Sequence, residues 1–201
     1  PDEGIWEGRS GRQHHTHSKA LCWVALDRLI AMHEAGCISV SAETFRAERD
    51  AIRAEIETYG YSEALESYVS TFGDDALDAS LLTLPLYGYI VAAHPRMRST
   101  YVRIRERLGR DDLVYRYLGT EDGLPPGEGA FGIASFWAVE CLARAGDLDA
   151  ATAAFERLLG HANDVGLYAE EIDPDTGEAL GNFPQAFTHV GLINAALTLA
   201  E

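Results

Sequence analysis

The sequence alternates between apolar segments and charged, amphipathic segments, each about the length of one helix. The apolar segments span residues 17–35, 76–91, 131–145 and 185–200, and the charged segments span residues 42–59, 96–108 and 148–162. A helix that is apolar all round is buried, whereas a helix with one polar face lies at the surface. The alternation therefore predicts an all-α protein of about seven helices, with helical hairpins arranged in an inner and an outer layer. Stacked helical repeats give a similar pattern, but no motif recurs at a fixed period.

Glycine, proline and aspartate mark where several of these helices begin, bend or end. Gly36 and Gly60 follow the first two helical segments, and glycine is common just past a helix. Pro85 lies inside the segment 76–91 and predicts a kink, because proline cannot donate a helical hydrogen bond. Asp147 directly precedes the segment 148–162 and is expected to cap it. Residues 64–71 are ambiguous and are interpreted as a brief extended segment.

The length and charge of the chain limit its architecture and its partners. With 201 residues it can bury a sizeable core, so we expect residues 1–201 to form a single domain. It carries 16 Lys and Arg residues against 32 Asp and Glu residues, a formal net charge of −16. Such a chain is a poor partner for nucleic acid, because a phosphate backbone binds clustered cations. The charge suits a neutral or cationic ligand.

The sequence contains no recognisable membrane span or secretory leader. No run of about 18 apolar residues occurs, and no basic stretch precedes an apolar one as in a signal peptide. Cys22, Cys37 and Cys141 are odd in number and form no CxxC pair, so we interpret them as buried thiols of a reducing compartment. These features lead us to expect a cytoplasmic protein that does not bind a membrane.

Three long loops, residues 1–16, 109–130 and 163–184, lead into or out of the inner helices. Loops of this length in a compact domain are usually functional. The first carries Glu7 directly after Trp6, and the third carries several acids, among them Glu170. Hydrolysis of a glycosidic bond needs one protonated and one ionised carboxyl group, and a neighbouring Trp can raise the pKa of an acid. The alternative is that these are ordinary solvated acids in an acidic chain.

The first loop also contains His14, His15 and His17, in the stretch GRQHHTHSK. A metal site is conceivable, but spacing such as HExxH is absent, and neighbouring loop histidines rarely all point at one ion. Hydrogen bonds to a polar ligand or to the adjacent helix terminus are the alternative roles. No GxxxxGK[ST] motif is present and no GxGxxG follows a strand, so we exclude nucleotide binding. We therefore expect neither a metal nor another cofactor.

The second loop mixes aromatic, cationic and acidic side chains in the stretch LVYRYLGTEDGLPPGEGAF. Its candidate binding residues are Arg116, Tyr117, Asp122 and Glu128. Such groups fit the recognition of sugar hydroxyls, because planar side chains make paired hydrogen bonds. Alternatively this is a surface loop in which Glu128 starts the next helix and complements its dipole. Both interpretations stay open on the sequence alone.

Four blocks of the sequence resemble glycoside hydrolase family 15, the bacterial glucoamylase and trehalase family. They are DEGIWEGRSGRQHHTHSKALCWVALDR, FGDDALDASLLTLPLYGY, LVYRY…GEGAFGIASFW and NDVGLYAEEIDPDTGEALGNFPQAFTHVGLINAA, in the family's order. The resemblance extends over essentially all 201 residues. It implies a bacterial enzyme whose catalytic domain is an (α/α)6 barrel of inner and outer helices. It also implies inversion of the anomeric centre as an exo-acting hydrolase releases glucose from an α-glucoside.

The resemblance implies roles for individual residues. The family's general acid follows the Trp of the first block and matches Glu7. Its general base is the first Glu of a (P/A)E(E/Q) motif and matches Glu170. The arginine that binds the non-reducing sugar matches Arg116, and the acid that follows it matches Asp122 or Glu128. Further predicted sugar contacts are Trp6, whose ring lines the acid, and Arg9, His17, Lys19 and Tyr117.

The same resemblance frames the chemistry. In an inverting hydrolase the two carboxyl groups lie roughly 6.5–9.5 Å apart, and we expect this of Glu7 and Glu170. Trehalose on one hand and α-1,4 or α-1,6 glucans on the other stay open as substrates. A related phosphorolytic family uses a similar barrel, but it needs phosphate-binding residues in place of a base, so Glu170 argues against that activity.

The chain departs from the family because it has about seven predicted helices where the complete barrel has twelve. We therefore expect a partial (α/α)6 barrel that corresponds to the C-terminal part of the catalytic domain. Half a ring exposes inner apolar faces, so we expect either a homo-oligomer formed through the open face or marginal stability. The alternative to an enzyme is a catalytically incompetent half-barrel that serves as a helical interaction or assembly module.

Overall fold

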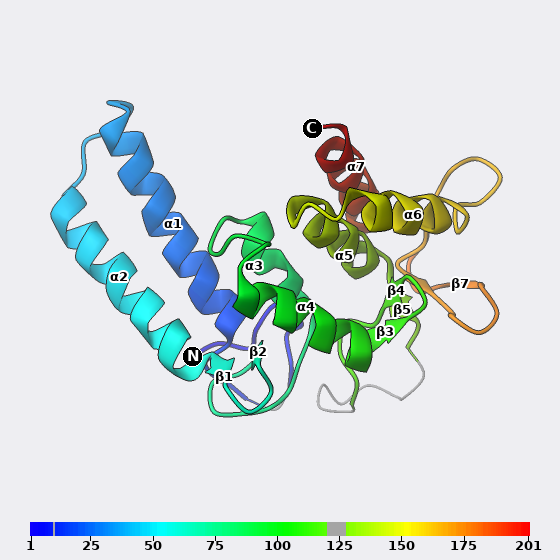
Figure 1. Cartoon of the computed structure of the whole chain (residues 1–201), viewed down its shortest axis with the longest axis horizontal. Helices are drawn as coiled ribbons and strands as arrows, with labels where there is room; N and C mark the ends of the chain where they lie inside the picture. The colour runs from blue at the N-terminus through cyan, green and yellow to red at the C-terminus, as the bar shows by residue number, and fades with distance from the viewer. Residues whose placement is uncertain (10, 120–127) are drawn as a thin grey trace.

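The described part of the chain, residues 1–9, 11–119 and 128–201 of a computed structural model, is built mainly from helices. Its seven α-helices and one 3₁₀ helix are α1 (Thr16–Glu34), α2 (Ala42–Tyr59), η1 (Ala79–Leu82), α3 (Thr83–Leu86), α4 (Pro95–Leu108), α5 (Gly132–Arg144), α6 (Leu148–Leu159) and α7 (Ala186–Ala200). They form a crescent, with the α1–α2 hairpin at one end and α5, α6 and α7 at the other (Figure 1). The predicted all-α class and the predicted number of helices are both confirmed.

Short antiparallel strands connect these helices. Strand β1 (Tyr61–Ser62) pairs with β2 (Ser67–Tyr68), and β3 (Gly109–Arg110) pairs with β4 (Leu113–Val114). A third sheet has β6 (Glu171–Ile172) between β5 (Ala130–Phe131) and β7 (Ala179–Leu180). The third sheet ties the second long loop to the third, so two segments that are distant in sequence meet just before α5.

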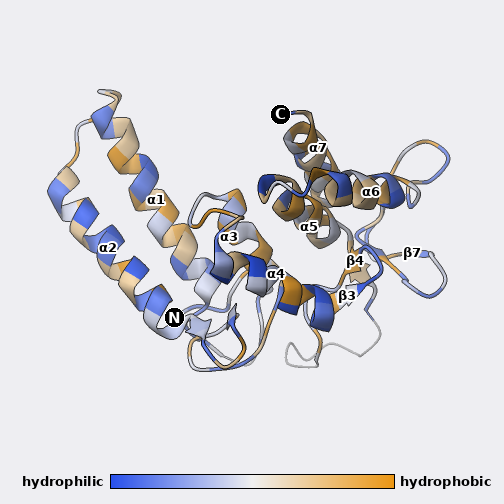
Figure 2. Ribbon diagram, in the orientation of Figure 1, coloured by the Kyte–Doolittle hydropathy of each residue, from blue (hydrophilic) through white to orange (hydrophobic). Residues whose placement is uncertain are grey.

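The helices form the predicted inner and outer layers. Along the inner row, α1 contacts α3, α3 contacts α5, and α5 contacts α7. On the outer side, α2 packs on α1, α4 packs on η1, and α6 packs on α5. The outer helix α2 is mostly hydrophilic, whereas α5 and α7 are mostly hydrophobic (Figure 2). The hydropathy of these three helices therefore follows their layers, as the sequence pattern predicts.

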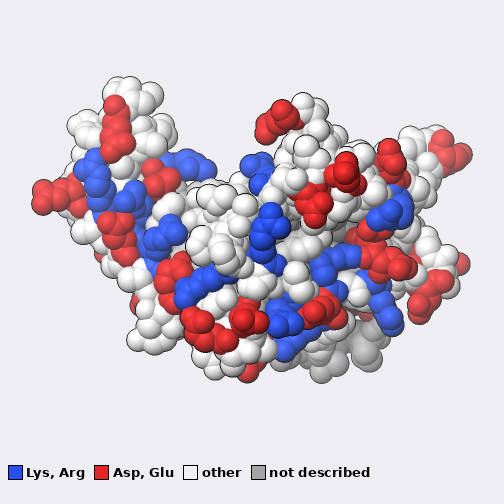
Figure 3. Space-filling view, in the orientation of Figure 1, with Lys and Arg blue, Asp and Glu red and all other residues white. Residues whose placement is uncertain are grey.

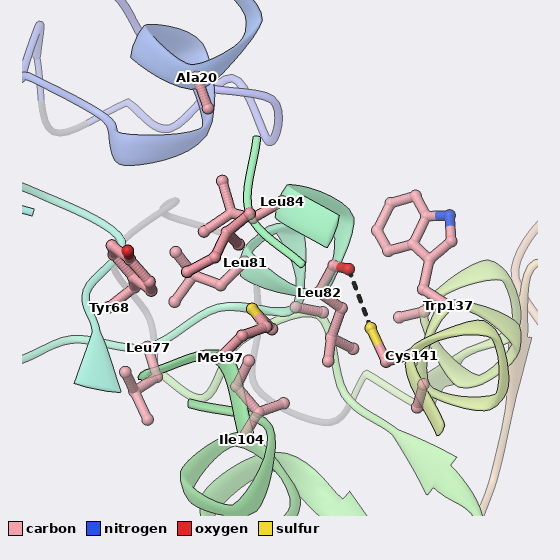
Figure 4. Close-up of a cluster of buried hydrophobic side chains, with 14 of the residues drawn as sticks. Ala20, Tyr68, Leu77, Leu81, Leu82, Leu84, Met97, Ile104, Trp137 and Cys141 are labelled. Atoms are coloured by element: carbon pink, nitrogen blue, oxygen red, sulfur yellow. Dashed lines mark hydrogen bonds between the residues drawn. The ribbon is translucent and has the colours of Figure 1, made fainter. Parts of the chain in front are cut away.

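Helix α5 is the centre of the core. Ten of its 13 residues are buried, against five of 19 in α1 and three of 15 in α7. Trp137 and Cys141 belong to a hydrophobic cluster that α5 shares with α1, η1 and α4, and the Cys141 thiol donates to the Leu82 carbonyl oxygen at 3.1 Å (Figure 4). Phe136 and Val139 belong to a second cluster, shared with α6 and α7. Because one helix serves both clusters, the crescent has a continuous core.

The two ends of the inner row are open. On α7, four apolar side chains at helical spacing are exposed: Phe187 at 62%, Val190 at 49%, Ile193 at 56% and Leu197 at 61%. On α1, Leu21 and Met32 are exposed. The outline of the molecule is hollowed between the α1–α2 hairpin and α7 (Figure 3). The expectation that inner apolar faces remain uncovered is therefore met at these two helices.

The segment 76–91 differs from the predicted helix. Only Ala79–Leu82 and Thr83–Leu86 are helical, as a 3₁₀ helix followed by one short α-helix, and Pro85 lies inside the latter. Asp78 starts the 3₁₀ helix by accepting the Ser80 N–H, and Gly88, with φ of +81°, lies two residues after the end of α3. Leu81, Leu82 and Leu84 are fully buried between neighbouring helices. A wholly apolar run shows burial but does not distinguish a long helix from an irregular buried segment.

Three smaller predictions were confirmed only in part. Gly36 follows α1 with φ of +74°, as expected just past a helix. Asp147 is the N-cap residue of α6, but its side chain makes no capping hydrogen bond within the described residues. Cys141 is buried, whereas the interpretation of Cys22 and Cys37 as buried thiols is wrong, since both are exposed. Within the described ranges, no helix is long and apolar enough to cross a membrane.

Candidate active site

The first loop folds back on itself and presents Glu7 at the surface. Asp2 and Gln13 exchange backbone hydrogen bonds of 3.0 and 2.9 Å, which close the loop in front of α1. The Asp2 carboxylate accepts the Gly4 N–H and the Ser18 hydroxyl, and its pKa is lowered by these donors against the opposing effect of burial. Glu7 has φ of +52°, an uncommon backbone conformation for a residue with a side chain. The turn therefore holds an exposed carboxylate in a defined, strained position.

Trp6 anchors this loop to the core. Its ring lies 5.6 Å from that of Phe131, 6.2 Å from that of Tyr117 and 6.5 Å from that of Trp137, as measured between centroids. The buried indole N–H makes no hydrogen bond within the described residues, although it lies close enough to Asp78 to favour that carboxylate. Burial nevertheless raises the pKa of Asp78. The aromatic contacts fix where the adjacent Glu7 emerges.

The third sheet places Glu170 beside the same aromatic cluster. Phe131 on β5 lies opposite Glu171 on β6, and the Gly132 N–H donates to the Glu170 carbonyl oxygen at 2.9 Å. Phe131 is thus in ring contact with Trp6 on one side and in strand register with Glu171 on the other. The loops that carry Glu7 and Glu170 therefore converge on one residue at the N-terminal end of α5.

The two adjacent acids of the third loop have different surroundings. Asn182 donates to Oε2 of Glu170 from both its backbone N–H, at 2.9 Å, and its side-chain amide, at 2.7 Å. Glu171 instead accepts the Gly129 N–H at 2.9 Å. Burial raises the pKa of Glu171, and the neighbouring Glu128 raises it further, against the opposing effects of the Gly129 N–H and Arg116. Glu170 and Glu171 therefore point to different partners despite being neighbours in sequence.

Arg116 and Glu128 form a paired group on the second loop. The Arg116 guanidinium donates through Nε to one carboxylate oxygen of Glu128, at 2.8 Å, and through a terminal nitrogen to the other. Its carbon Cζ lies 5.0 Å from the Tyr117 ring and 5.6 Å from the Phe131 ring. Of the two readings left open for Glu128, the helix start is wrong, because α5 begins only at Gly132.

The remaining predicted contacts are dispersed. His17 lies in the first turn of α1, is only 5% exposed, and has its ring 6.3 Å from that of Tyr87. Lys19 forms an ion pair of 2.7 Å with Glu55 of α2. Arg9 is exposed on the first loop. Asp122 lies outside the described residues. A sugar contact by any of these residues stays a prediction.

A separate cavity of about 340 Å³ lies next to Trp6 and Tyr117. Its walls come from the first loop, from residues 70–78 and from the end of α4, and they include neither Glu7 nor Glu170. In the part of the chain that the structure describes, no group of three His, Cys, Asp or Glu side chains is arranged to hold a metal ion. The candidate catalytic groups therefore lie outside this cavity, Glu7 exposed and Glu170 half-buried.

Sequence reasoning did not assign roles to Phe131, Gly181 and Asn182. Phe131 connects the two acid-bearing loops, and Asn182 holds the proposed base. Their importance depends on the pairing of β5, β6 and β7, which a single sequence does not reveal. The one local signal in the sequence was the pair Gly181–Asn182, because these residue types are typical of a turn.

The architecture defines a class of protein, a partial (α/α)6 barrel of the glucoamylase type. A wild-type glycosidase structure superimposes with a TM-score of 0.82 at 18% identity, over 98% of this chain and 54% of that one. The glucoamylase from Saccharomycopsis fibuligera superimposes with a TM-score of 0.75 at 13% identity, over 98% of this chain and 57% of that one. At these identities the likeness establishes the fold.

The sequence establishes the family. The pattern of Glycosyl hydrolases family 15 matches residues 1–197, and the chain belongs to that family. It is 46% identical to a trehalase of Mycobacterium tuberculosis, over 98% of this chain and 29% of the relative. It is 38% identical to a trehalase of Thermoplasma acidophilum, over 100% of this chain and 35% of the relative. The chain thus spans about a third of the length of these relatives.

Proposed function

We propose that this chain contributes the acid and the base of an inverting, exo-acting α-glucoside hydrolase. Glu7 protonates the glycosidic oxygen as the bond to the anomeric carbon breaks. Glu170 accepts a proton from a water molecule, whose oxygen attacks the anomeric carbon from the opposite face. Arg116 binds the non-reducing sugar. Residues 1–201 act as one domain in this proposal, corresponding to the C-terminal part of the family's catalytic barrel.

One observation carries the proposal. Phe131 lies in ring contact with Trp6, the neighbour of Glu7, and its strand pairs with the strand that follows Glu170. This relationship supports a common site for two acids that are far apart in sequence. Trp6, half-buried and directly before the proposed acid in the sequence, also supplies an aromatic face for a sugar ring.

Trehalose is the substrate that we propose first. Two relatives that are each 46% identical to this chain are named trehalases. A glycosidase structure with a TM-score of 0.83 was solved in complex with glucose, which supports a glucose-releasing activity for a protein of this fold. Hydrolysis of α-1,4 or α-1,6 glucans is the competing specificity, and the chain offers no residue that separates the two.

Glucose release from trehalose, maltose and isomaltose tests the proposal. We expect Glu7→Gln and Glu170→Gln each to reduce kcat by about 10²–10⁴-fold, the usual contribution of a general acid or base. Glu178→Gln, an exposed acid of the same loop as Glu170, is the matched control and should retain activity. Activity that survives both catalytic substitutions would refute the assignment of the carboxylates. A silent wild-type chain would refute hydrolysis by the chain on its own.

The second candidate function is a helical assembly module that pairs with another copy. It is favoured by the four exposed apolar side chains of α7, a helix without a single Lys, Arg, Asp or Glu. Copies with a formal charge of −16 repel each other, so a contact between copies is best made by a charge-free, apolar face. We propose α7 as that face.

Light scattering after size-exclusion chromatography tests this second candidate. We expect a concentration-dependent dimer, and Ile193→Glu on the exposed face of α7 should shift it to monomer. Met32→Glu, at the exposed end of α1, is the matched control and should leave the dimer unchanged. A wild-type monomer at all concentrations would rule out pairing, and equal effects of both variants would rule out α7 as the contact.

A further inference from the structure

We propose that Asn182 and Gly181 are positioning residues for Glu170, which hold one carboxylate oxygen and leave the other free to accept a proton from water. This inference deepens the proposed function and rests on it. Both residues lie between β7 and α7, in a segment whose side chains are exposed.

The hydrogen bonds to the Glu170 carboxylate are unequal between its two oxygens. Oε2 accepts both the Asn182 backbone N–H and the Asn182 side-chain amide, at 2.9 and 2.7 Å. Within the described residues, Oε1 accepts none. A carboxylate oxygen has two lone pairs, so the two donors occupy Oε2, and Oε1 keeps its full capacity to accept. Oε1 is therefore the atom that we assign to the attacking water.

A backbone hydrogen bond also holds Asn182, the donor, next to Glu170, the acceptor. The Glu170 N–H donates to the Asn182 carbonyl oxygen at 2.9 Å, while the Asn182 N–H donates to Oε2. The two residues are thus joined by three hydrogen bonds in both directions, directly before the paired strand β6. Such a reciprocal arrangement leaves the Glu170 side chain little freedom to rotate, which is what a base aimed at a bound substrate needs.

Gly181 makes this approach possible. It has φ of +71°, and a β-carbon placed on it would stand 2.8 Å from Oε2 and 3.0 Å from Cβ of Glu170. A side chain at position 181 would be strained and would push the carboxylate away from its donors. The glycine therefore serves close contact with Glu170, in addition to the turn.

Gly181 and Asn182 together are called the clamp here, because they hold one carboxylate oxygen of Glu170. In the proposed reaction the clamp acts only through Glu170. A water O–H proton moves to Oε1, the water oxygen bonds to the anomeric carbon, and the glycosidic bond breaks as Glu7 protonates the leaving oxygen. Loss of the Asn182 side chain removes one donor, so the carboxylate can turn and present either oxygen. We expect Asn182→Ala to lower kcat by about 10–100-fold, with KM within about twofold, because a misplaced group of this kind weakens the chemical step rather than binding.

Kinetics of single and double variants distinguish positioning from a general structural effect. Asn182→Ala should have no further effect in the Glu170→Gln background, because its partner is already disabled. Gly181→Ala should repeat the loss in kcat. Asn163→Ala is the matched control, because the Asn163 side chain is likewise hydrogen-bonded in an exposed turn, where it accepts the Val165 and Leu167 N–H groups and makes no hydrogen bond to Glu170. Equal losses in kcat for Asn182→Ala in both backgrounds would overturn the proposal.

A measurement without substrate tests the clamp independently of the proposed function. Because Asn182 is exposed, its backbone amide should exchange rapidly with solvent unless Glu170 holds it. We expect hydrogen exchange of that amide to be at least about tenfold faster in Glu170→Ala than in the wild-type chain. An unchanged rate would overturn the clamp even in an active enzyme. If the wild-type chain releases no glucose, the proposed hydrolysis fails, and the exchange rate alone decides whether the clamp exists.

Discussion

Arg116 donates hydrogen bonds to both carboxylate oxygens of Glu128, and both side chains are largely shielded from solvent, at 18% and 25% exposure. Glu128→Ala leaves the guanidinium without its partner in this shielded position. We expect a loss of about 1–3 kcal/mol in the free energy of unfolding, the usual cost of an unsatisfied charged group. Chemical denaturation of the two proteins measures the difference.

The control for this prediction is an exposed pair of the same kind. Glu106→Ala removes one of the two ion-pair partners of Arg103 on α4, and the Glu106 and Arg103 side chains are 54% and 36% exposed. Solvent screens such a pair, so we expect a much smaller change than for Glu128→Ala. Equal losses in the two variants would contradict the structural role assigned to the pair of Arg116 and Glu128.

His17 should make the chain sensitive to acid. Burial lowers the pKa of His17 from 6.5 to about 4, with Asp2 opposing the shift and His15 adding to it. A histidine with a lowered pKa in the folded state contributes stability above its unfolded pKa and loses that contribution as the pH falls. Between pH 6.5 and pH 4 we expect His17 to account for on the order of 3 kcal/mol of lost stability.

Unfolding at a series of pH values measures this contribution. His17→Gln removes the titration, so the difference in stability between pH 7 and pH 4 should become smaller in the variant. His14→Gln, which alters an exposed ring three residues before His17, serves as the control and should keep the wild-type slope. Identical slopes in the wild type and in His17→Gln would show that His17 is not buried as a neutral ring.

Glu140 should have the opposite pH dependence. It is 3% exposed on α5, and burial raises its pKa, against the weaker effect of Arg144 at 3.8 Å. A carboxyl group with a raised pKa stabilises the folded state below its ordinary pKa of 4.5 and loses that contribution as the pH rises. We expect Glu140→Gln to unfold at a higher temperature than the wild type at pH 8, with the difference shrinking towards pH 4.5. A constant difference across this range, measured by calorimetry, would contradict the burial of an ionisable Glu140.

The core of the crescent can be tested on a single helix. Ile104 on α4 is fully buried, whereas Val102 on the same helix is 48% exposed. Ile104→Ala should cost about 2–5 kcal/mol through lost burial and the resulting cavity. Val102→Ala should change stability by less than about 0.5 kcal/mol. Similar losses for both substitutions would mean that α4 packs with a different face.

The layering of the helices could be predicted from the sequence because it depends on hydrophobicity alone. Helix α2 shows a polar outer face and α5 shows none, and these patterns lead directly to their layers. The prediction of one long helix over residues 76–91 was wrong because hydrophobicity alone does not determine backbone conformation. This segment is apolar because α1, α4 and α5 surround it, and the same burial would suit a helix, a strand or a turn. Only the contacts in space decide that η1 and α3 are short.

The candidate site could be predicted in part. Glu7 and Glu170 could be selected because they match family motifs, and a motif specifies residue types and their order along the chain. The support of Glu170 by Asn182 depends on a backbone pairing across 12 positions, and the meeting of Trp6 with Phe131 depends on the folding of two loops. Neither of these two contacts produces a recognisable residue pattern in the sequence. Asp147 shows the converse, because a suitable capping residue was present and its side chain did not bond.

The inner row ends in two different helices, α1 and α7, and this limits how copies of the chain can combine. Each copy brings four inner segments, formed by α1, η1 with α3, α5 and α7, so two copies that closed a ring would bring eight. A barrel of the (α/α)6 type has room for six. A twofold dimer joined through both open ends would therefore enclose a wider ring than the family's barrel, with its two sets of acids set further apart. A dimer joined through α7 alone avoids this, and it leaves α1 of each copy available to a different helical partner.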